Sequence, residues 1–261
     1  MLVIGERING MFKNVRNAIA EHDKAVIVDL AKRQLEAGAH VLDINVGPAS
    51  DDPVNAMLWL VDTVQEAVDA PLAIDSAKWE VFEPALARCK QPPFINSTTG
   101  AQEQLNFFVP LAMKYNASLI ALTIDEQGVP STTEGRTEIA MRILVAAMEH
   151  GLPTDRLYID PITLPVKAVQ DQCAKQLEAL RQFRQLADPP PHTVIGLSNV
   201  SQRAQEKRLI DRTFLVMCIA NGLDSAILDP LDKDLMDAMV TAELLLNKQL
   251  YCDSYLEAYH R

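Results

Sequence analysis

Eight short apolar runs recur along the chain, and a loop and a longer amphipathic segment follow each of them. The runs are continuously apolar rather than alternating, which is typical of strands buried on both faces of a parallel sheet. Strands of this kind alternating with helices leave two architectures, a closed barrel or an open doubly wound sheet. The eight predicted strands are Leu2–Gly5, His40–Val46, Pro71–Ser76, Pro93–Ser97, Ser118–Ile124, Leu157–Pro161, Thr193–Asn199 and Ser225–Asp229.

The segments between these runs carry the signals of helices. In one of them, Met57, Leu60, Val61 and Val64 recur at helical spacing and form a single apolar stripe. An aspartate and a proline precede that stripe, as an N-cap and a first helical residue would. Residues suited to a helix C-cap lie a few positions before four of the predicted strands, at Gly38, Asn116, Gly151 and Gly222.

Length decides between the two architectures. Eight strand–helix units in 261 residues match a (β/α)₈ TIM barrel, which typically needs about 250 residues. The sequence has neither of the glycine-rich motifs that open sheets use to bind nucleotide phosphates, G-x-G-x-x-G and G-x-x-x-x-G-K-[ST]. No linker or change in composition marks a boundary. We therefore predict one domain over residues 1–261.

Charge and cysteine usage exclude several classes of partner. The formal net charge is −11, and the one compact basic cluster, Arg203, Lys207 and Arg208, is too small to cover duplex phosphates. No apolar run approaches the roughly 20 residues that span a bilayer, and the first residues do not resemble a signal peptide. The four scattered cysteines form no metal or disulfide pattern. These features predict a cytoplasmic protein that binds neither nucleic acid nor membrane.

Polar residues gather where the predicted strands end. In a barrel of this kind the chemistry lies at the carboxyl ends of the strands. One such side chain is ordinarily a cap or an internal hydrogen-bond partner. Many of them at one mouth favour a ligand with several donors and acceptors. The residues concerned are Glu6, Asp43, Asn45, Asp75, Ser76, Asn96, Ser97, Thr98, Asp160, Ser198, Asn199 and Asp229.

The residue types narrow the choice of ligand. No histidine follows a predicted strand, which disfavours a hydrolytic metal centre, and no lysine lies within one, which disfavours a Schiff base. Carboxylates alone could still hold Mg²⁺. A pterin fits equally well, because its pyrimidine edge presents adjacent N–H donors beside a carbonyl, and carboxylates and amides pair with such an edge. Both ligands remain open at this point.

Five segments of the sequence resemble one enzyme family. They are IGERING (4–10), LDINVGPA (42–49), FINST (94–98), YIDPITLP (158–165) and VIGLSNVSQ (194–202). In this order they resemble the pterin-binding methyltransferases, most closely the methyltetrahydrofolate:corrinoid protein methyltransferases. The folate domain of cobalamin-dependent methionine synthase and dihydropteroate synthase are more distant kin. A synthase would carry a lysine on the seventh strand and a basic motif on the eighth, where this chain reads VIGLSN and AILDP.

The resemblance implies roles for individual residues. Asp75, Asn96 and Asp160 match the residues that hold the pterin ring, and Asn199 matches the residue that hydrogen-bonds near N5. An alternative role for Asn199 is to cap the following helix. Three further positions would line the same pocket, namely Gly196, Ser198 and Gln202. The basic cluster near them suggests, independently, a contact from Lys207 to the glutamate tail of folate.

The implied reaction is transfer of the N5-methyl group between methyltetrahydrofolate and cobalt, which makes the protein a transferase of class EC 2.1.1. N5 must gain positive charge as the methyl leaves, so a hydrogen bond or proton at N5 would accelerate the transfer. Asn199 could orient that proton but not supply it. The chain has no D-x-H-x-x-G motif, so the corrinoid must be carried by a partner protein, docked at the barrel mouth. The resemblance also suggests a homodimer, and it leaves the direction of transfer open.

Two alternatives remain, a barrel lyase that uses carboxylate-bound Mg²⁺ and a pterin-binding protein without catalytic activity. We expect methyl transfer to continue in EDTA without added metal, because pterin binding accounts for the carboxylates. Assays with and without chelator distinguish the three cases. If activity is lost in EDTA and restored by Mg²⁺ or Zn²⁺, the prediction of a methyltransferase that needs no metal is contradicted. If no methyl is transferred with or without chelator, the pterin-binding protein without catalytic activity is favoured.

Overall fold

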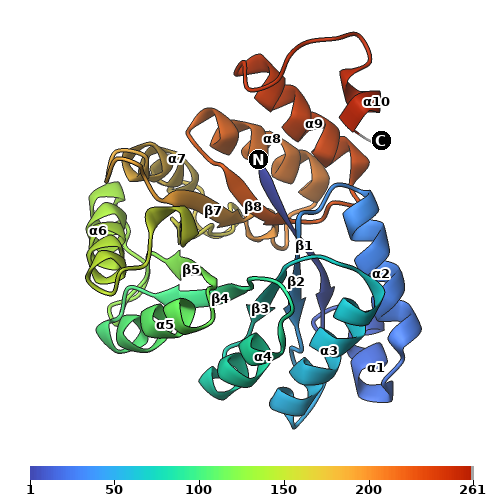
Figure 1. The fold of residues 1–261 in the computed structure, drawn as a ribbon. Helices are drawn as coiled ribbons and strands as arrows, with labels where there is room; N and C mark the ends of the chain where they lie inside the picture. The colour runs from blue at the N-terminus through green and yellow to red at the C-terminus, as the bar shows by residue number, and fades with distance from the viewer. Residues whose placement is uncertain (260–261) are drawn as a thin grey trace.

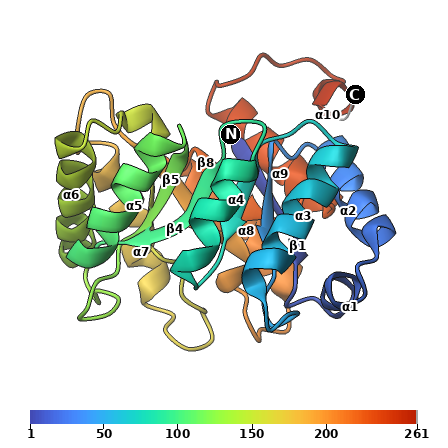
Figure 2. The ribbon, with the colours of Figure 1, turned by 60° about the horizontal axis from the view of Figure 1, so that its bottom comes forward.

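Eight parallel strands close into one barrel in chain order, and helices surround it (Figures 1 and 2). The computed structural model describes residues 1–259. Each of the eight apolar runs overlaps one strand, so the predicted (β/α)₈ barrel is confirmed. The strands are β1 Leu2–Asn9, β2 Val41–Asn45, β3 Leu72–Asp75, β4 Phe94–Thr99, β5 Ser118–Leu122, β6 Leu157–Asp160, β7 His192–Gly196 and β8 Ser225–Leu228.

A ring of helices covers the outside of the barrel (Figure 1). They are α1 Lys13–Glu21, α2 Lys24–Glu36, α3 Pro53–Ala67, α4 Phe82–Arg88, α5 Gln102–Lys114, α6 Thr133–Glu149, α7 Gln172–Phe183, α8 Lys207–Ala220, α9 Lys233–Leu245 and α10 Tyr255–Tyr259. Three one-turn 3₁₀ helices complete the set, η1 Trp79–Val81, η2 Thr154–Arg156 and η3 Leu197–Asn199. Within residues 1–259, no helix is both long and apolar enough to span a membrane.

The predicted helix signals act as expected. The Asp52 side chain accepts a hydrogen bond from the Asn55 backbone N–H at 3.1 Å, and Pro53 is the first residue of α3. The four predicted C-cap residues all adopt positive φ, a region in which glycine and asparagine are tolerated best. Their φ angles are 98° at Gly38, 52° at Asn116, 75° at Gly151 and 99° at Gly222.

The core has two parts. A smaller cluster fills the inside of the barrel, and a larger one lies between the barrel and its helices. Met57, Leu60, Val61 and Val64 belong to the larger cluster, as their helical spacing predicts. The smaller cluster consists of Ile4, Val41, Ala73, Phe94, Ile120, Tyr158 and Val194, and it makes the barrel a packed core rather than a pore.

Two strands, β1 and β7, end three or more residues away from the predicted position. β1 continues to Asn9 through an irregularity between Gly5 and Ile8. At this irregularity the Arg7 N–H donates to Oε1 of the buried Gln34 at 2.9 Å instead of to a neighbouring strand. The strand can therefore continue through the polar residues that follow the apolar run. β7 stops at Gly196, and the next three residues form η3 instead of a strand.

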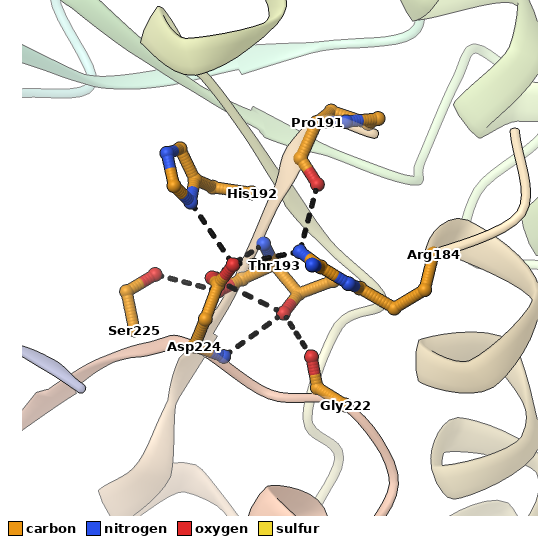
Figure 3. Close-up of polar contacts among 7 residues, drawn as sticks. All are labelled: Arg184, Pro191, His192, Thr193, Gly222, Asp224 and Ser225. Atoms are coloured by element: carbon orange, nitrogen blue, oxygen red, sulfur yellow. Dashed lines mark hydrogen bonds and ion pairs between the residues drawn. The ribbon is translucent and has the colours of Figure 1, made fainter. Parts of the chain in front are cut away.

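The amino ends of β7 and β8 are joined by the carboxylate of Asp224 (Figure 3). It accepts hydrogen bonds from the Thr193 backbone N–H at 2.9 Å and from Arg184 at 2.8 Å, and it lies 2.9 Å from Nδ1 of His192. The ring of His192 stacks on Tyr158, part of the cluster inside the barrel. The network therefore stabilises the end of the barrel opposite the predicted site.

Candidate active site

A cavity of about 240 Å³ opens at the carboxyl ends of the strands. It brings together side chains from β1, β2, β3, β4, β6 and the η3 turn, which are far apart in the sequence. Its lining contains six of the eight residues predicted from sequence: Asp75, Asn96, Asp160, Gly196, Ser198 and Asn199. The other lining residues are Glu6, Asn9, Asp43, Ser97, Leu122 and Ile227.

Two predicted residues lie outside this cavity. Gln202 is exposed, and the turn that follows η3 carries it past the lining, although its backbone N–H donates to the carbonyl of Asn199 at 3.2 Å. A shared pocket for Gln202 and Ser198 is therefore not what the structure shows. Lys207 begins α8 and lines an adjoining cleft of about 460 Å³, which shares Glu6 and Ser198 with the cavity.

Paired carboxylates and amides occupy one side of the cavity. Asn96 donates to Asp43 at 2.9 Å, and Asn45 donates to Asp75 at 2.6 Å. Burial raises the pKa of both carboxyls, and the neighbouring charge of Asp75 raises the pKa of Asp43 further. Each amide offsets part of this effect because it donates to the ionised carboxylate. The register of adjacent parallel strands, with Asn45 opposite Asp75 and Asp75 opposite Asn96, holds these groups together.

Asp160 lies at the end of β6 and is 6% exposed. Burial raises its pKa to about 7, while backbone N–H groups of Ile162 and Gly196 and the charge of Arg136 act in the opposite direction. The Ile162 N–H donates to the carboxylate at 2.6 Å, and Ile162 itself has a φ of 64°. That conformation is unusual for a β-branched residue, so the chain accepts local strain next to Asp160.

Glu6 lines the cavity from the first strand, and sequence reasoning did not assign it a role. Ser198 Oγ donates to Glu6 Oε1 at 2.5 Å. Burial raises the pKa of Glu6 to about 7, and this hydrogen bond lowers it in part. The irregularity in β1 directs Glu6 here, and it depends on Gly5, where a Cβ would lie 2.5 Å from Oε1 of Gln34. The sequence signals for this residue were its place after the first predicted strand and the IGERING segment.

Gly196 and Asn199 fit closely against each other across the η3 turn. A Cβ on Gly196 would lie 3.0 Å from the amide nitrogen of Asn199, a distance shorter than ordinary van der Waals contact. A larger residue at position 196 would therefore displace the Asn199 amide. Because Gly196 and Ser198 belong to the same strand end and turn, the local chain positions three cavity residues as a unit.

A second, more apolar cleft of about 530 Å³ borders the cavity on the β2 and β3 side. It contains Val46, Pro53 and Met57, and it shares Asp75 with the cavity. The mouth of the barrel is therefore a small polar cavity between a charged cleft and an apolar one. Such a surface can bind a flat polar heterocycle centrally and leave room on either side for larger attached groups.

The donor set suits a heterocycle that presents N–H donors. In the part of the chain that the structure describes, no three His, Cys, Asp or Glu side chains are grouped so that they could hold a metal ion. Buried carboxylates with raised pKa values gain from a ligand with N–H donors, because those donors replace part of the lost solvation.

Comparison with known proteins identifies the family of the chain. A family model described as "Pterin binding enzyme" matches residues 12–229. A methylcorrinoid:tetrahydrofolate methyltransferase from Eubacterium limosum is 32% identical over 263 aligned residues, covering 100% of this chain and 97% of that protein. A methionine synthase from Mycobacterium tuberculosis is 30% identical over 87% of this chain, but that match spans only 20% of the synthase.

Solved structures give the same fold at lower sequence identity. A dihydropteroate synthase from Yersinia pestis superposes with a TM-score of 0.65 at 18% identity, over 94% of this chain and 93% of that one. The same enzyme with a pterin–sulfa conjugate superposes with a TM-score of 0.68 at 16% identity, over 95% and 94% of the two chains. At these identities the likeness concerns the fold.

The burial of Asp160 predicts a pH-dependent change in stability. A carboxyl with a folded-state pKa of about 7 and an unfolded-state pKa of about 3.9 binds protons more tightly when folded, so its contribution to stability is lost as the pH rises from 4 to 7. In Asp160→Asn the side chain stays uncharged at every pH, so this loss of stability does not occur. We expect this substitution to raise the free energy of unfolding by roughly 1–3 kcal/mol at pH 8 and to leave it nearly unchanged at pH 4.

Urea unfolding of wild type and variant at both pH values measures this difference. Asp52→Asn is the matched control. Hydrogen bonds from Asn55 lower the pKa of the exposed Asp52, so its contribution to the free energy of unfolding depends on pH with the opposite sign. If the Asp160→Asn variant is less stable than wild type at pH 8, the negative charge of Asp160 does not destabilise the fold.

Proposed function

Because this chain belongs to the family of pterin-binding enzymes, we propose that it moves the N5-methyl group between methyltetrahydrofolate and the cobalt of a separate corrinoid protein. The observation that carries the proposal is the likeness to the Eubacterium limosum protein over the full length of both chains, since that protein is named for the same reaction. The charges and donors of the cavity are consistent with it. The mechanism is reversible, so the proposal covers both directions of transfer.

The pterin ring would bind among Asp75, Asn96 and Asp160. An ionised Asp160 accepts two parallel hydrogen bonds from the adjacent donors of the pyrimidine edge, and the Asn96 amide bonds a ring donor and a ring acceptor. Asp75 accepts from the remaining donors. All three line one cavity of about 240 Å³, which is small enough to exclude most water from the ring. Binding would therefore relieve the poor solvation of these carboxylates.

Methyl transfer would proceed by direct displacement, with cobalt(I) as the nucleophile. The C–N5 bond breaks with its electron pair on N5, which is a poor leaving group unless it carries a proton. The Asn199 amide, held against Gly196, would hydrogen-bond near N5 and orient that proton. This interaction strengthens only as charge develops, so it would act on the transition state.

The corrinoid would arrive on a partner protein that docks over the mouth of the barrel. Cobalt has to approach the methyl group in line with the breaking bond, and the mouth is the open side of the cavity. The apolar cleft beside it and the 70% exposed Met11 at its rim offer surface for a large macrocycle and its carrier. No corrinoid-binding motif is present in the sequence itself.

The glutamate tail of folate would extend into the charged cleft toward Lys207, which lines that cleft with Arg208. Asp229 and Asp232 pair with neighbouring cations there, so Lys207 would supply positive charge for a carboxylate. Lys207→Ala should weaken binding of polyglutamylated folate several-fold at low salt and have less effect on the monoglutamate. Equal affinities of wild type and variant for the polyglutamate would rule out this contact.

We further propose a cytoplasmic homodimer. The outer face of α8 carries Leu209 and Met217, two turns apart and 60% and 44% exposed, which is more apolar surface than a solvated helix needs. All four cysteines are free thiols, in keeping with a reducing compartment. Sedimentation at twice the 28.9 kDa chain mass, lost in Leu209→Glu, would support the dimer, whereas a monomer in the wild type would refute it.

Two substitutions separate binding from catalysis. Asp160→Ala should weaken folate binding by roughly 2–4 kcal/mol, because a buried charge-assisted pair is lost while the ring charge it contacts stays constant during transfer. Asn199→Ala should lower the rate constant of transfer at saturating folate, with a smaller loss of affinity, because N5 gains charge only as the methyl departs. Equilibrium binding of methyltetrahydrofolate and single-turnover transfer to free cob(I)alamin measure the two effects.

Asp52→Asn, on the exposed surface, is the control for both measurements and should match the wild type. If Asn199→Ala binds folate as poorly as Asp160→Ala yet transfers methyl at the wild-type rate once saturated, Asn199 serves only to hold the ring. If the wild type transfers no methyl to cob(I)alamin, the proposed function itself is wrong.

A further inference from the structure

The methyl transfer proposed above requires a proton at N5, and we propose that Glu6 supplies it through the hydroxyl of Ser198 and takes it back in the reverse reaction. The inference rests on the proposed function, because N5 is the atom that gains the proton. It adds a proton donor near Asn199, whose amide has no proton to release, in a site where the ring-binding carboxyls are assigned to the pyrimidine edge.

The other polar groups of the cavity are committed elsewhere. An amide such as Asn199 has no proton that it can release at neutral pH. Asp43 accepts from Asn96 and Asp75 accepts from Asn45, so each of these carboxyls already has an amide partner, and neither contacts Ser198. Asp160 is held by the N–H of Ile162 and is assigned to the pyrimidine edge, away from N5.

Glu6 differs from them in its contact. Its carboxylate accepts a hydrogen bond of 2.5 Å from Ser198 Oγ, and Ser198 directly precedes Asn199 in the η3 turn. All three residues line the same cavity. A hydroxyl can accept a proton from one side while it donates its own to the other, so Ser198 can connect Glu6 to the region that Asn199 organises.

Glu6 also has a route to solvent. It lines the cleft of about 460 Å³ that adjoins the cavity, together with Ser198. Protons can therefore reach Glu6 from the cleft while the pterin and the docked corrinoid partner close the cavity. None of the other three carboxyls of the cavity lines this cleft.

Charges from several elements set the protonation of Glu6. Burial raises its pKa to about 7, near the pH at which a general acid is most effective, and Asp229 after β8 and Asp211 on α8 raise it too. Ser198 and Arg7 lower it. The other charged groups that line the cavity are Asp43, Asp75 and Asp160, and Lys207, Arg208 and Asp232 line the cleft.

The proposed step balances in both directions. In the forward direction the cobalt(I) electron pair forms the Co–CH₃ bond, the C–N5 bond pair stays on N5, and N5 receives a proton from Ser198, which receives one from Glu6. The products are methylcobalt(III), tetrahydrofolate with N5–H, and ionised Glu6, which regains a proton through the cleft. In reverse, the N5 proton passes through Ser198 to ionised Glu6 as the methyl arrives.

The test is single-turnover transfer from saturating methyltetrahydrofolate to free cob(I)alamin between pH 5.5 and 9, with a parallel measurement of folate affinity. Because folate is saturating, an effect of Asp160 protonation on folate binding does not alter the measured rate constant. We expect the wild-type rate constant to fall as the pH rises through about 7. Glu6→Gln, which keeps the shape and the acceptor for Ser198, should lower the low-pH rate constant about 10²-fold, abolish the pH dependence and change folate affinity less than about 3-fold.

Two further variants distinguish proton transfer from a structural role. Ser198→Ala should also slow the transfer and flatten its pH dependence, because it interrupts the relay while Glu6 remains. Asp229→Asn removes a negative charge near Glu6, so it should move the midpoint of the pH profile to lower pH.

The proposal fails if Glu6→Gln transfers methyl with the wild-type rate and pH profile. It also fails if Glu6→Gln keeps the wild-type pH dependence and loses only folate affinity, since Glu6 would then be a binding residue. A Ser198→Ala variant with the wild-type rate and pH profile would refute the relay. In all of these cases a wild type that transfers methyl leaves the proposed function intact, whereas an inactive wild type refutes that function first.

Discussion

Closure of the parallel sheet is the constraint on which the rest of the molecule depends. Eight strands in chain order bring all their carboxyl ends to one mouth, so residues as distant in sequence as Glu6 and Ser198 are hydrogen-bonded. Closure also leaves no strand edge unpaired and fills the interior with apolar side chains from seven strands. The network around Asp224 stabilises the opposite end, where no ligand is expected.

The mouth concentrates acidic groups in a place where water solvates them poorly. Burial raises the pKa of Glu6, Asp43, Asp75 and Asp160, and it is the largest cause of the shift in each case. Amides and backbone N–H groups compensate only part of this cost. A ligand rich in N–H donors would provide the remainder, so the unfavourable burial of these carboxyls would become a source of affinity. A carboxyl whose pKa is raised to about 7, as that of Glu6 is, can exchange a proton near neutral pH.

Sequence reasoning succeeded where local chemistry determines structure. The apolar runs, the Asp52 cap and the left-handed residues such as Gly38 depend on neighbours within one turn, and all of them are found as predicted. It was less complete where a position depends on a distant element. The irregularity in β1 relies on Gln34 from α2, so the extent of that strand and the direction of Glu6 could not be read from the GER motif.

The sequence by itself determined the order of strands and helices, the barrel they form, and the acidic and amide residues at the strand ends, because short-range periodicity and capping specify these features. Only the tertiary structure decided which of those residues share a cavity. It brought Glu6 into that cavity and left Gln202 on the surface. It also decided which carboxyls are poorly solvated, because the solvation of a charge depends on everything packed around it and not on its neighbours in the chain.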